Sequence, residues 1–474
     1  MTSMFMIAIE ATIVSTAMPQ IVARLGGLHL YSWIFSSFLL TQTAMTVVFG
    51  KLADVRGRKP VMLAGIAIFL IGSILAGFAD SMMMMVVFRL IQGVGAGAMQ
   101  PVAMTIVADL YPARERGKIQ GYLASVWAIS AVLGPIAGGL IIRHWSWPWV
   151  FWINVPVGIA AAACFTVFLH EQAKHERRSI DVVGATSFTV AVASLLIALT
   201  EAGTSDHRTV LVWCGIFCLS LVLFVAQERR AADPMISFAL WSRRPIAAAN
   251  SVGVFASMAL MGLTTFLPMY VQGVLHRSPV VAGLALTMML VGWPAGATLA
   301  ARSFHRFGLR QILVAGSVLV PAGTVAFVLL TPESSPITAA AGSLVMGFGM
   351  GLVSVSSLVL VQELVDWSQR GSVTASNLFA RNLGSTLGAT VLGAVFNYGL
   401  ARANDGKIVT SDQLRRLLEA PTGTLTANTG IGLALQRSLN LTLWAMLVIS
   451  LAVALLALWV PPVEMRQAVE VPAE

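Results

Sequence analysis

The sequence predicts an all-α polytopic membrane protein with 14 transmembrane helices, arranged as two six-helix pseudo-repeat bundles plus two inserted helices. Composition is the first reason: the 474-residue chain is 57% hydrophobic and 11% charged, with a mean hydropathy of +0.82, whereas soluble domains carry roughly 25% charged residues. Apolar runs long enough to cross a hydrocarbon core of about 30 Å also recur along the whole chain. Glycine-rich motifs of the first half recur in the second half in the same order.

Fourteen apolar runs, separated by charged residues, Gly and Pro, are the expected membrane spans. They lie near residues 4–22, 31–50, 60–79, 82–107, 118–142, 148–169, 181–200, 209–227, 246–272, 279–301, 310–331, 336–361, 372–400 and 438–460. The first run lacks a basic leading segment and carries Glu10 within its apolar stretch. We therefore expect a retained first span and not a cleaved signal peptide.

The distribution of basic residues predicts the orientation. With the N-terminus inside, inner loops hold about twice as many Lys and Arg residues as outer ones, as the positive-inside rule requires. This places a multi-pass protein in a bacterial-type cytoplasmic (inner) membrane, with both termini cytoplasmic and a long extracytoplasmic loop at 401–437. The net charge of +9 is spread over these loops and does not form one patch, so the lipid bilayer is an expected partner and nucleic acid is not.

Internal matches predict the domain organisation. At one constant offset, six glycines of the first half fall on six of the second: Gly93, Gly95, Gly97, Gly117, Gly134 and Gly139 match Gly347, Gly349, Gly351, Gly371, Gly388 and Gly393. The segment 53–59 likewise matches 304–310 around a central glycine. We expect an N-terminal six-helix bundle (1–170), two inserted linker helices (171–243) and a C-terminal six-helix bundle (244–474), a plan used by secondary transporters.

Glu10 is the acid that lies most clearly within a predicted span. A charged side chain at the centre of a bilayer costs roughly 2.5–3.5 kcal/mol on insertion scales, so such residues are candidates for function. Burial favours the protonated carboxyl, whereas a nearby cation such as Arg89 favours the ionised form, and together they permit exchange of a proton. Two alternatives stay open: Glu10 lies shallow and anchors the helix at the cytoplasmic interface, and Arg89 extends to the outer interface.

The loop between the second and third spans, GKLADVRGRK, carries a set of residues that a basic loop alone does not require: Gly50, Asp54, Gly57, Arg58 and Lys59. The glycines allow a sharp turn and close backbone approach, and Asp54 can accept from helix N-terminal amides or pair with a cation. The set resembles the loop signature of the major facilitator superfamily, although Val55 stands where that family has a basic residue. The resemblance implies a gate in which Asp54 and Arg58 latch the two halves together.

Three further segments extend the resemblance over nearly the whole chain. RLIQGVGAGAMQP (89–101) is similar to the fourth-span motif of the superfamily, whose arginine is linked to proton transfer. SAVLGPIAGGLI (130–141) resembles its antiporter motif, formed here by Gly134, Pro135, Gly138 and Gly139. EATIVSTAMP (10–19) resembles the first-span motif of the fourteen-helix drug–proton antiporters, with Glu10 at the aspartate position. In the segment 145–158, Pro148 replaces the family's usual arginine.

The expected function is therefore a proton-coupled secondary active exporter, an antiporter of hydrophobic, cationic drug-like compounds that works by alternating access, as in multidrug efflux and antibiotic resistance. Glu10 and Arg89 are the expected proton-coupling and cation-binding residues. The expected partners are a small hydrophobic substrate and protons, with the proton gradient in place of a cofactor, no metal, and a monomeric chain. One alternative is an exporter of a single endogenous lipid, siderophore or peptide. The other is a membrane enzyme or a non-transporting sensor, which the sequence does not support because it contains no nucleotide-binding loop or metal cluster.

Polar side chains within the spans are candidates for the substrate path. They are Gln42, Gln92, Asn154, Gln272, Asn377, Arg381 and Asn382. Arg381 has two possible roles: it contacts an anionic cargo, or it forms a structural pairing between helices across the interface of the halves.

Overall fold

The computed structural model describes residues 2–110, 126, 129–130, 133–169, 182–201, 207–231, 241–365, 370–403 and 430–461. The helices of the first part are α1 (Thr2–Leu25), α2 (Tyr31–Arg56), α3 (Arg58–Gly77), α4 (Met82–Leu110), α6 (Trp149–Trp152) and α7 (Asn154–Phe168). They are followed by α8 (Val182–Glu201) and α9 (His207–Arg230). The last part holds α11 (Arg244–Gly273), α12 (Pro279–Phe307), α13 (Leu309–Val328), α14 (Pro336–Glu363), α15 (Arg370–Ala403) and α17 (Gly430–Trp459).

Eleven helical segments of the described residues are long and apolar enough to cross a membrane. The predicted spans 118–142, 181–200 and 372–400 are not among them. Of the span 118–142, only residues 126, 129–130 and 133–142 are described. Helix α15, which covers the span 372–400, carries asparagines and arginines along its length. The all-helical membrane class is confirmed, whereas the count of fourteen spans stays a prediction.

Two predicted boundaries are wrong. Of the loop expected at 401–437, residues 401–403 belong to α15 and residues 430–437 belong to α17. The last span, predicted at 438–460, begins at Gly430 in the structure, so that Arg437 lies within α17. The predicted span 148–169 is found at Trp149–Phe168, which contains α6 and α7 with the single residue Ile153, itself in helical backbone conformation, between them.

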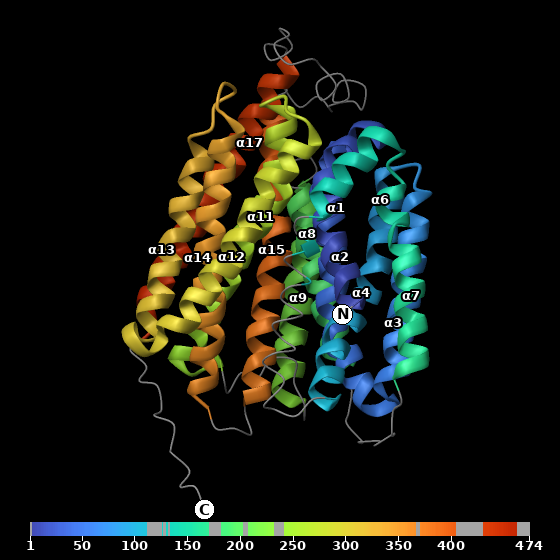
Figure 1. Ribbon diagram of the computed structural model, residues 1–474, viewed down its shortest axis with the longest axis vertical. Helices are drawn as coiled ribbons and strands as arrows, with labels where there is room; N and C mark the ends of the chain where they lie inside the picture. Colours follow the sequence, from blue (N-terminus) through green and yellow to red (C-terminus); the bar gives the residue numbers. More distant parts are fainter. Residues whose placement is uncertain are drawn as a thin grey trace, which may run out of the picture.

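The helices form two groups with α8 and α9 between them in the view of Figure 1. The first group contains α1–α7, here called the N-half, and the second contains α11–α17, here called the C-half. The inserted helix α8 packs on α9 and contacts both α2 and α15. An aromatic cluster fixes this contact, since Phe188 of α8 lies 5.6 Å from the ring of Phe224 in α9 and 5.4 Å from that of Phe379 in α15. The insert therefore covers the junction of the two halves.

The two halves use matched glycines in matched ways. Gly57 (φ 95°) joins α2 to α3, and Gly308 (φ 79°) joins α12 to α13. Only glycine adopts this left-handed backbone without strain. Within the helices, Gly97 of α4 lies against the backbone of α2 at Gln42, and Gly351 of α14 lies against the backbone of α12 at Trp293. The repeat seen in the sequence thus corresponds to equivalent turns and helix contacts.

Candidate functional site: a buried ion pair beside the junction of the halves

An ion pair lies inside the N-half. Arg89 of α4 donates from Nη1 to Oε1 of Glu10 in α1, and Asn154 of α7 donates from Nδ2 to Oε2 of the same carboxylate at 2.6 Å. Glu10 is 0% exposed and Arg89 is 2% exposed. Neither side chain extends into solvent, so the alternatives, in which Glu10 anchors the helix at the cytoplasmic interface and Arg89 extends to the outer one, find no support in these contacts.

Further groups hold the guanidinium in place. Arg89 donates from Nη1 to Oε1 of Gln92 at 2.6 Å and from Nε to the carbonyl of Ile34 at 3.2 Å. Its guanidinium also lies over the ring of Phe38, 4.2 Å from the centroid. Gln92 in turn donates to the hydroxyl of Ser73 at 2.7 Å. Side chains or backbone from α1, α2, α3, α4 and α7 therefore meet around one carboxylate.

The opposite face of α1 meets the C-half. Ser15 donates its hydroxyl to the carbonyl of Thr264 in α11. Glu10 and Ser15 are five residues apart, so they point to nearly opposite sides of a helix with 3.6 residues per turn. The carboxylate therefore faces the interior of the N-half, and both of its oxygens bind protein groups. The expectation that cargo competes directly for Glu10 does not fit this conformation.

The halves are held together at the end of the bundle where α1 and α11 finish. Gln272 of α11 donates to the carbonyl of Thr16 at 3.1 Å, and the hydroxyl of Tyr31 donates to the carbonyl of Thr265 at 2.8 Å. Asn397 of α15 donates to the carbonyl of His29 at 2.7 Å. In the predicted topology this closed end is extracytoplasmic.

The glycines of the predicted antiporter motif lie in this closed region. A Cβ on Gly138 would lie 3.0 Å from the carbonyl oxygen of Ile13 in α1, and one on Gly139 would lie 3.1 Å from the backbone nitrogen of Val280 in α12. Pro135 packs on Gly283 of α12. The motif therefore touches α1 on one side and the C-half on the other, and its small residues permit that close approach.

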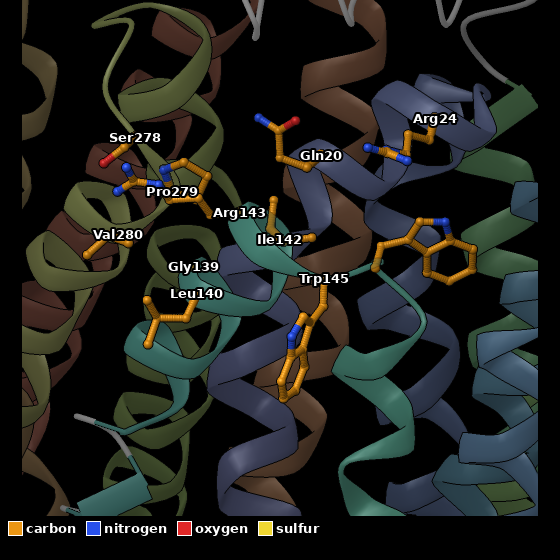
Figure 2. Close-up of a pocket in the computed structure, with 11 residues that line it drawn as sticks. Gln20, Arg24, Gly139, Leu140, Ile142, Arg143, Trp145, Ser278, Pro279 and Val280 are labelled. Atoms are coloured by element: carbon orange, nitrogen blue, oxygen red, sulfur yellow. The ribbon is translucent and has the colours of Figure 1, made fainter.

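A cavity of about 600 Å³ lies at the same end, between α1, the helical residues 133–144 and the start of α12. Gln20, Arg24, Arg143, Trp145, Trp147 and Ser278 are among the residues that line it. Figure 2 shows Arg143 extending towards Ser278 and Pro279, so residues of both halves surround the cavity. Its tryptophans suit a position at the membrane surface.

The predicted gating loop is only partly visible. A Cβ added to Gly50 would lie 4.0 Å from Cβ of Pro101 in α4. Lys59 donates to the carbonyl of Thr166 in α7 at 2.8 Å. The contact of Lys59 is internal to the N-half. The side chain of Asp54 lies outside the described residues, so the latch between Asp54 and Arg58 stays a prediction.

The candidate path residues separate into three groups. Gln92 and Asn154 belong to the carboxylate cluster and are 0% exposed, and their place on the cargo path stays a prediction. Gln272 joins the halves, and Gln42 donates to Gln100 of α4 at 3.3 Å. The remaining three, Asn377, Arg381 and Asn382, all lie on α15.

The sequence pattern did not single out a polar group in the C-half. Asn250 of α11 accepts from Asn377 at 3.0 Å and donates to Ser376 at 3.3 Å, while the indole of Trp241 donates to Ser376 at 2.6 Å. Asn250 is a polar residue within an apolar span, as Asn377 is, and this property is the sequence signal that marks it.

Two helical halves that meet at one end, with an ion pair buried inside one of them, have the organisation of a membrane transporter. Comparison with known proteins agrees, because residues 1–389 match the family described as the Major Facilitator Superfamily. The chain belongs to the Major Facilitator Superfamily.

Several relatives carry transport in their names. The "Multidrug transporter protein MdtP" of Bacillus subtilis (strain 168) is 34% identical over 411 residues, covering 86% of this chain and 75% of that protein. The "Multidrug resistance protein 3" of the same organism is also 34% identical, over 82% of this chain and 77% of that protein. The "Efflux pump FUS6" of Gibberella fujikuroi is 31% identical, over 83% and 73%. These relatives indicate a transporter and not an enzyme.

Solved structures share the fold. A bacterial homologue of the human lysosomal transporter Spinster, in an inward-facing and occupied conformation, matches with a TM-score of 0.65 and 16% identity, over 96% of this chain and 94% of that one. A D-xylose–proton symporter matches with a TM-score of 0.60 and 12% identity, over 94% and 95%. At these identities the likeness concerns the fold alone.

Proposed function

We propose that this transporter exports small hydrophobic compounds in exchange for protons, by alternating access between the two halves. The observation that carries the proposal is the ion pair between Glu10 and Arg89, which joins the buried carboxylate of α1 to α4 inside the N-half. The same helix α1 also contacts the C-half through Ser15. The names of the multidrug relatives support export of drug-like compounds.

The chemistry of the pair suggests how a proton is coupled to movement. A proton on Glu10 removes the negative charge that holds Arg89, and the guanidinium keeps Gln92 and the carbonyl of Ile34 as partners. The loss of the pair releases α1 from α4, and the contacts of Ser15 and Thr16 with α11 loosen with it. The proton site and the cargo site are then separate, and α1 connects them.

The expected cationic cargo is compatible with this scheme only after Arg89 has released the carboxylate, since both oxygens are otherwise occupied.

A second candidate function is export of one endogenous product. A relative named "Acurin A biosynthesis cluster MFS-type transporter", from Aspergillus aculeatus, is 31% identical over 83% of this chain and favours that candidate. A broad pattern of competing compounds supports multidrug export, whereas one dominant competitor supports the second candidate.

The test uses purified protein in liposomes that contain the pH indicator pyranine, with an imposed pH gradient and ethidium as a hydrophobic cationic probe. We expect ethidium uptake into inside-out vesicles to be accompanied by proton release, and Glu10→Gln to abolish both. Glu10→Asp should retain part of the exchange, and Glu363→Gln, the same chemical change at the end of α14, should leave it intact. Equal proton release by the parent protein and Glu10→Gln would refute a coupling role for this carboxylate.

A further inference from the structure

A second arginine lies in the middle of a helix, at Arg381 of α15. Its guanidinium lies 5.6 Å from the ring centroid of Trp293 in α12, and its stem passes over Gly253 of α11, whose potential Cβ would be 3.4 Å from Cγ of the arginine. Among the described residues no carboxylate lies within ion-pair distance of Arg381, and no oxygen accepts its N–H groups. The predicted structural alternative, a pairing between helices, is therefore represented there only by the contact with Trp293.

The contrast with Arg89 shows why this is unusual. Arg89 is nearly fully buried and has a carboxylate, an amide, a backbone carbonyl and an aromatic ring as partners. Arg381 is half-buried and, within the described part of the chain, has the aromatic ring only. A guanidinium has five N–H donors in a rigid plane and stays charged in proteins. Placing it in a membrane span without acceptors is costly unless another molecule supplies them.

The position of Arg381 places it on the side of the C-half that faces the N-half. Gly253 and Thr264 of α11 are eleven residues apart, which is close to three full turns, so they share one face of the helix. Thr264 on this face accepts the hydroxyl of Ser15 from the N-half. Arg381 crosses the same face at Gly253, further from the closed end.

On the cytoplasmic side of the contact between Ser15 and Thr264 in the predicted topology, part of the face of α1 is uncovered. Ala11 lies one turn before Ser15 on the same face of α1, and it is exposed although the residues around it are buried. Arg381 also lies five residues before Thr386, whose hydroxyl is 3.4 Å from that of Thr43 in α2. Five residues correspond to about 7.5 Å along a helix. Arg381 is thus about two turns of α15 or less from a contact between the halves, and it lies on the face of the C-half that meets the N-half.

We propose that Arg381 and Trp293 form a subsite that binds the acidic group of an aromatic cargo, a carboxylate, sulfonate or phosphate attached to a planar hydrophobic body. The guanidinium supplies paired N–H donors to the acidic group, and the indole of Trp293 stacks on the aromatic body and holds the guanidinium in position. Asn377, one turn earlier on α15, leaves its Oδ1 buried without a partner in the described structure and can accept from a hydroxyl of the cargo. This inference rests on the proposed export function, and it assigns cargo selection to the C-half and proton binding to the N-half.

Three fluorescent probes that differ only in the head group test the subsite: 1-pyrenebutyrate, its neutral amide, and the corresponding trimethylammonium compound. Binding to the full-length protein in nanodiscs is measured by equilibrium dialysis, with empty nanodiscs subtracted. We expect the carboxylate to bind about tenfold or more tightly than the amide, since a gain of about 1.4 kcal/mol gives a factor of ten. Equal binding of the carboxylate and the amide by the parent protein would overturn the proposal without any variant.

Variants then separate recognition from folding. Arg381→Gln should remove the preference for the carboxylate and leave binding of the amide unchanged, while Arg381→Lys should retain part of the preference because it keeps the charge. Trp293→Leu should weaken all three probes. An equal loss for all three probes in Arg381→Gln would show a structural role and contradict the proposal. Binding needs no pH gradient, so a failure of gradient-driven export in the liposome assay leaves this result standing and refutes the export function alone.

Discussion

Gly139 provides a direct test of how the halves close, because its neighbour across the junction is Val280 of α12. In Gly139→Val the added Cβ would lie 3.1 Å from the backbone nitrogen and 3.2 Å from Cα of Val280, and the two γ carbons need further room. Overpacking of this kind costs about 1–3 kcal/mol in a packed interior. The clash exists only while the halves are closed at this end, so the substitution should favour the opposite conformation by roughly 5- to 150-fold.

Spin-label distances across the closed end measure this shift. Labels at Asp80→Cys and Glu333→Cys lie on exposed turns of the N-half and the C-half, after replacement of the exposed Cys164, Cys214 and Cys218 by serine. Gly139→Val should increase the longer-distance population. Gly430→Ala is the matched control, because nothing lies within 4 Å of its potential Cβ, and Gly65→Ala controls for crowding inside the N-half, against Ala98 at 2.7 Å. An unchanged distance distribution in Gly139→Val would refute the assignment of this contact to one conformation.

Three further predictions concern stability and coupling. Arg89→Met leaves Glu10 buried without its cation and should destabilise the protein by about 3–5 kcal/mol, measured as a lower melting temperature in detergent. Adding Glu10→Gln should restore part of the lost stability. A double variant no more stable than Arg89→Met alone would contradict the pairing. Asn154→Leu removes the donor to Oε2 of Glu10 and should weaken proton exchange in the pyranine assay more than Asn440→Leu, a substitution on α17. Gly57→Ala forces a residue with a Cβ into φ 95° and should cost about 1–2 kcal/mol, whereas Gly215→Ala, with open space around it, should leave the melting temperature unchanged.

The class of the fold and the residues of the ion pair could both be predicted from the sequence. A charge inside an apolar run is so costly that the position of Glu10 and Arg89 in the chain is enough to mark them as functional candidates. The repeated glycines likewise predicted close helix contacts, since a residue without a side chain inside a helix usually marks a close neighbour. The ends of α15 and α17 could not be predicted well, because one arginine within an apolar stretch does not end a helix.

The sequence by itself determined that this chain lies in a membrane, that its two halves repeat, and that Glu10 and Arg89 are special. Only the tertiary structure decided which groups share a site: it joined Gln92 and Asn154 to the carboxylate, turned Glu10 away from the C-half, and left Arg381 beside Trp293 without an acid among the described residues. The reason is physical. The free-energy cost of placing a charged side chain in an apolar span depends on residue type and local sequence. Which side chains contact one another depends on how helices far apart in the chain are rotated against one another.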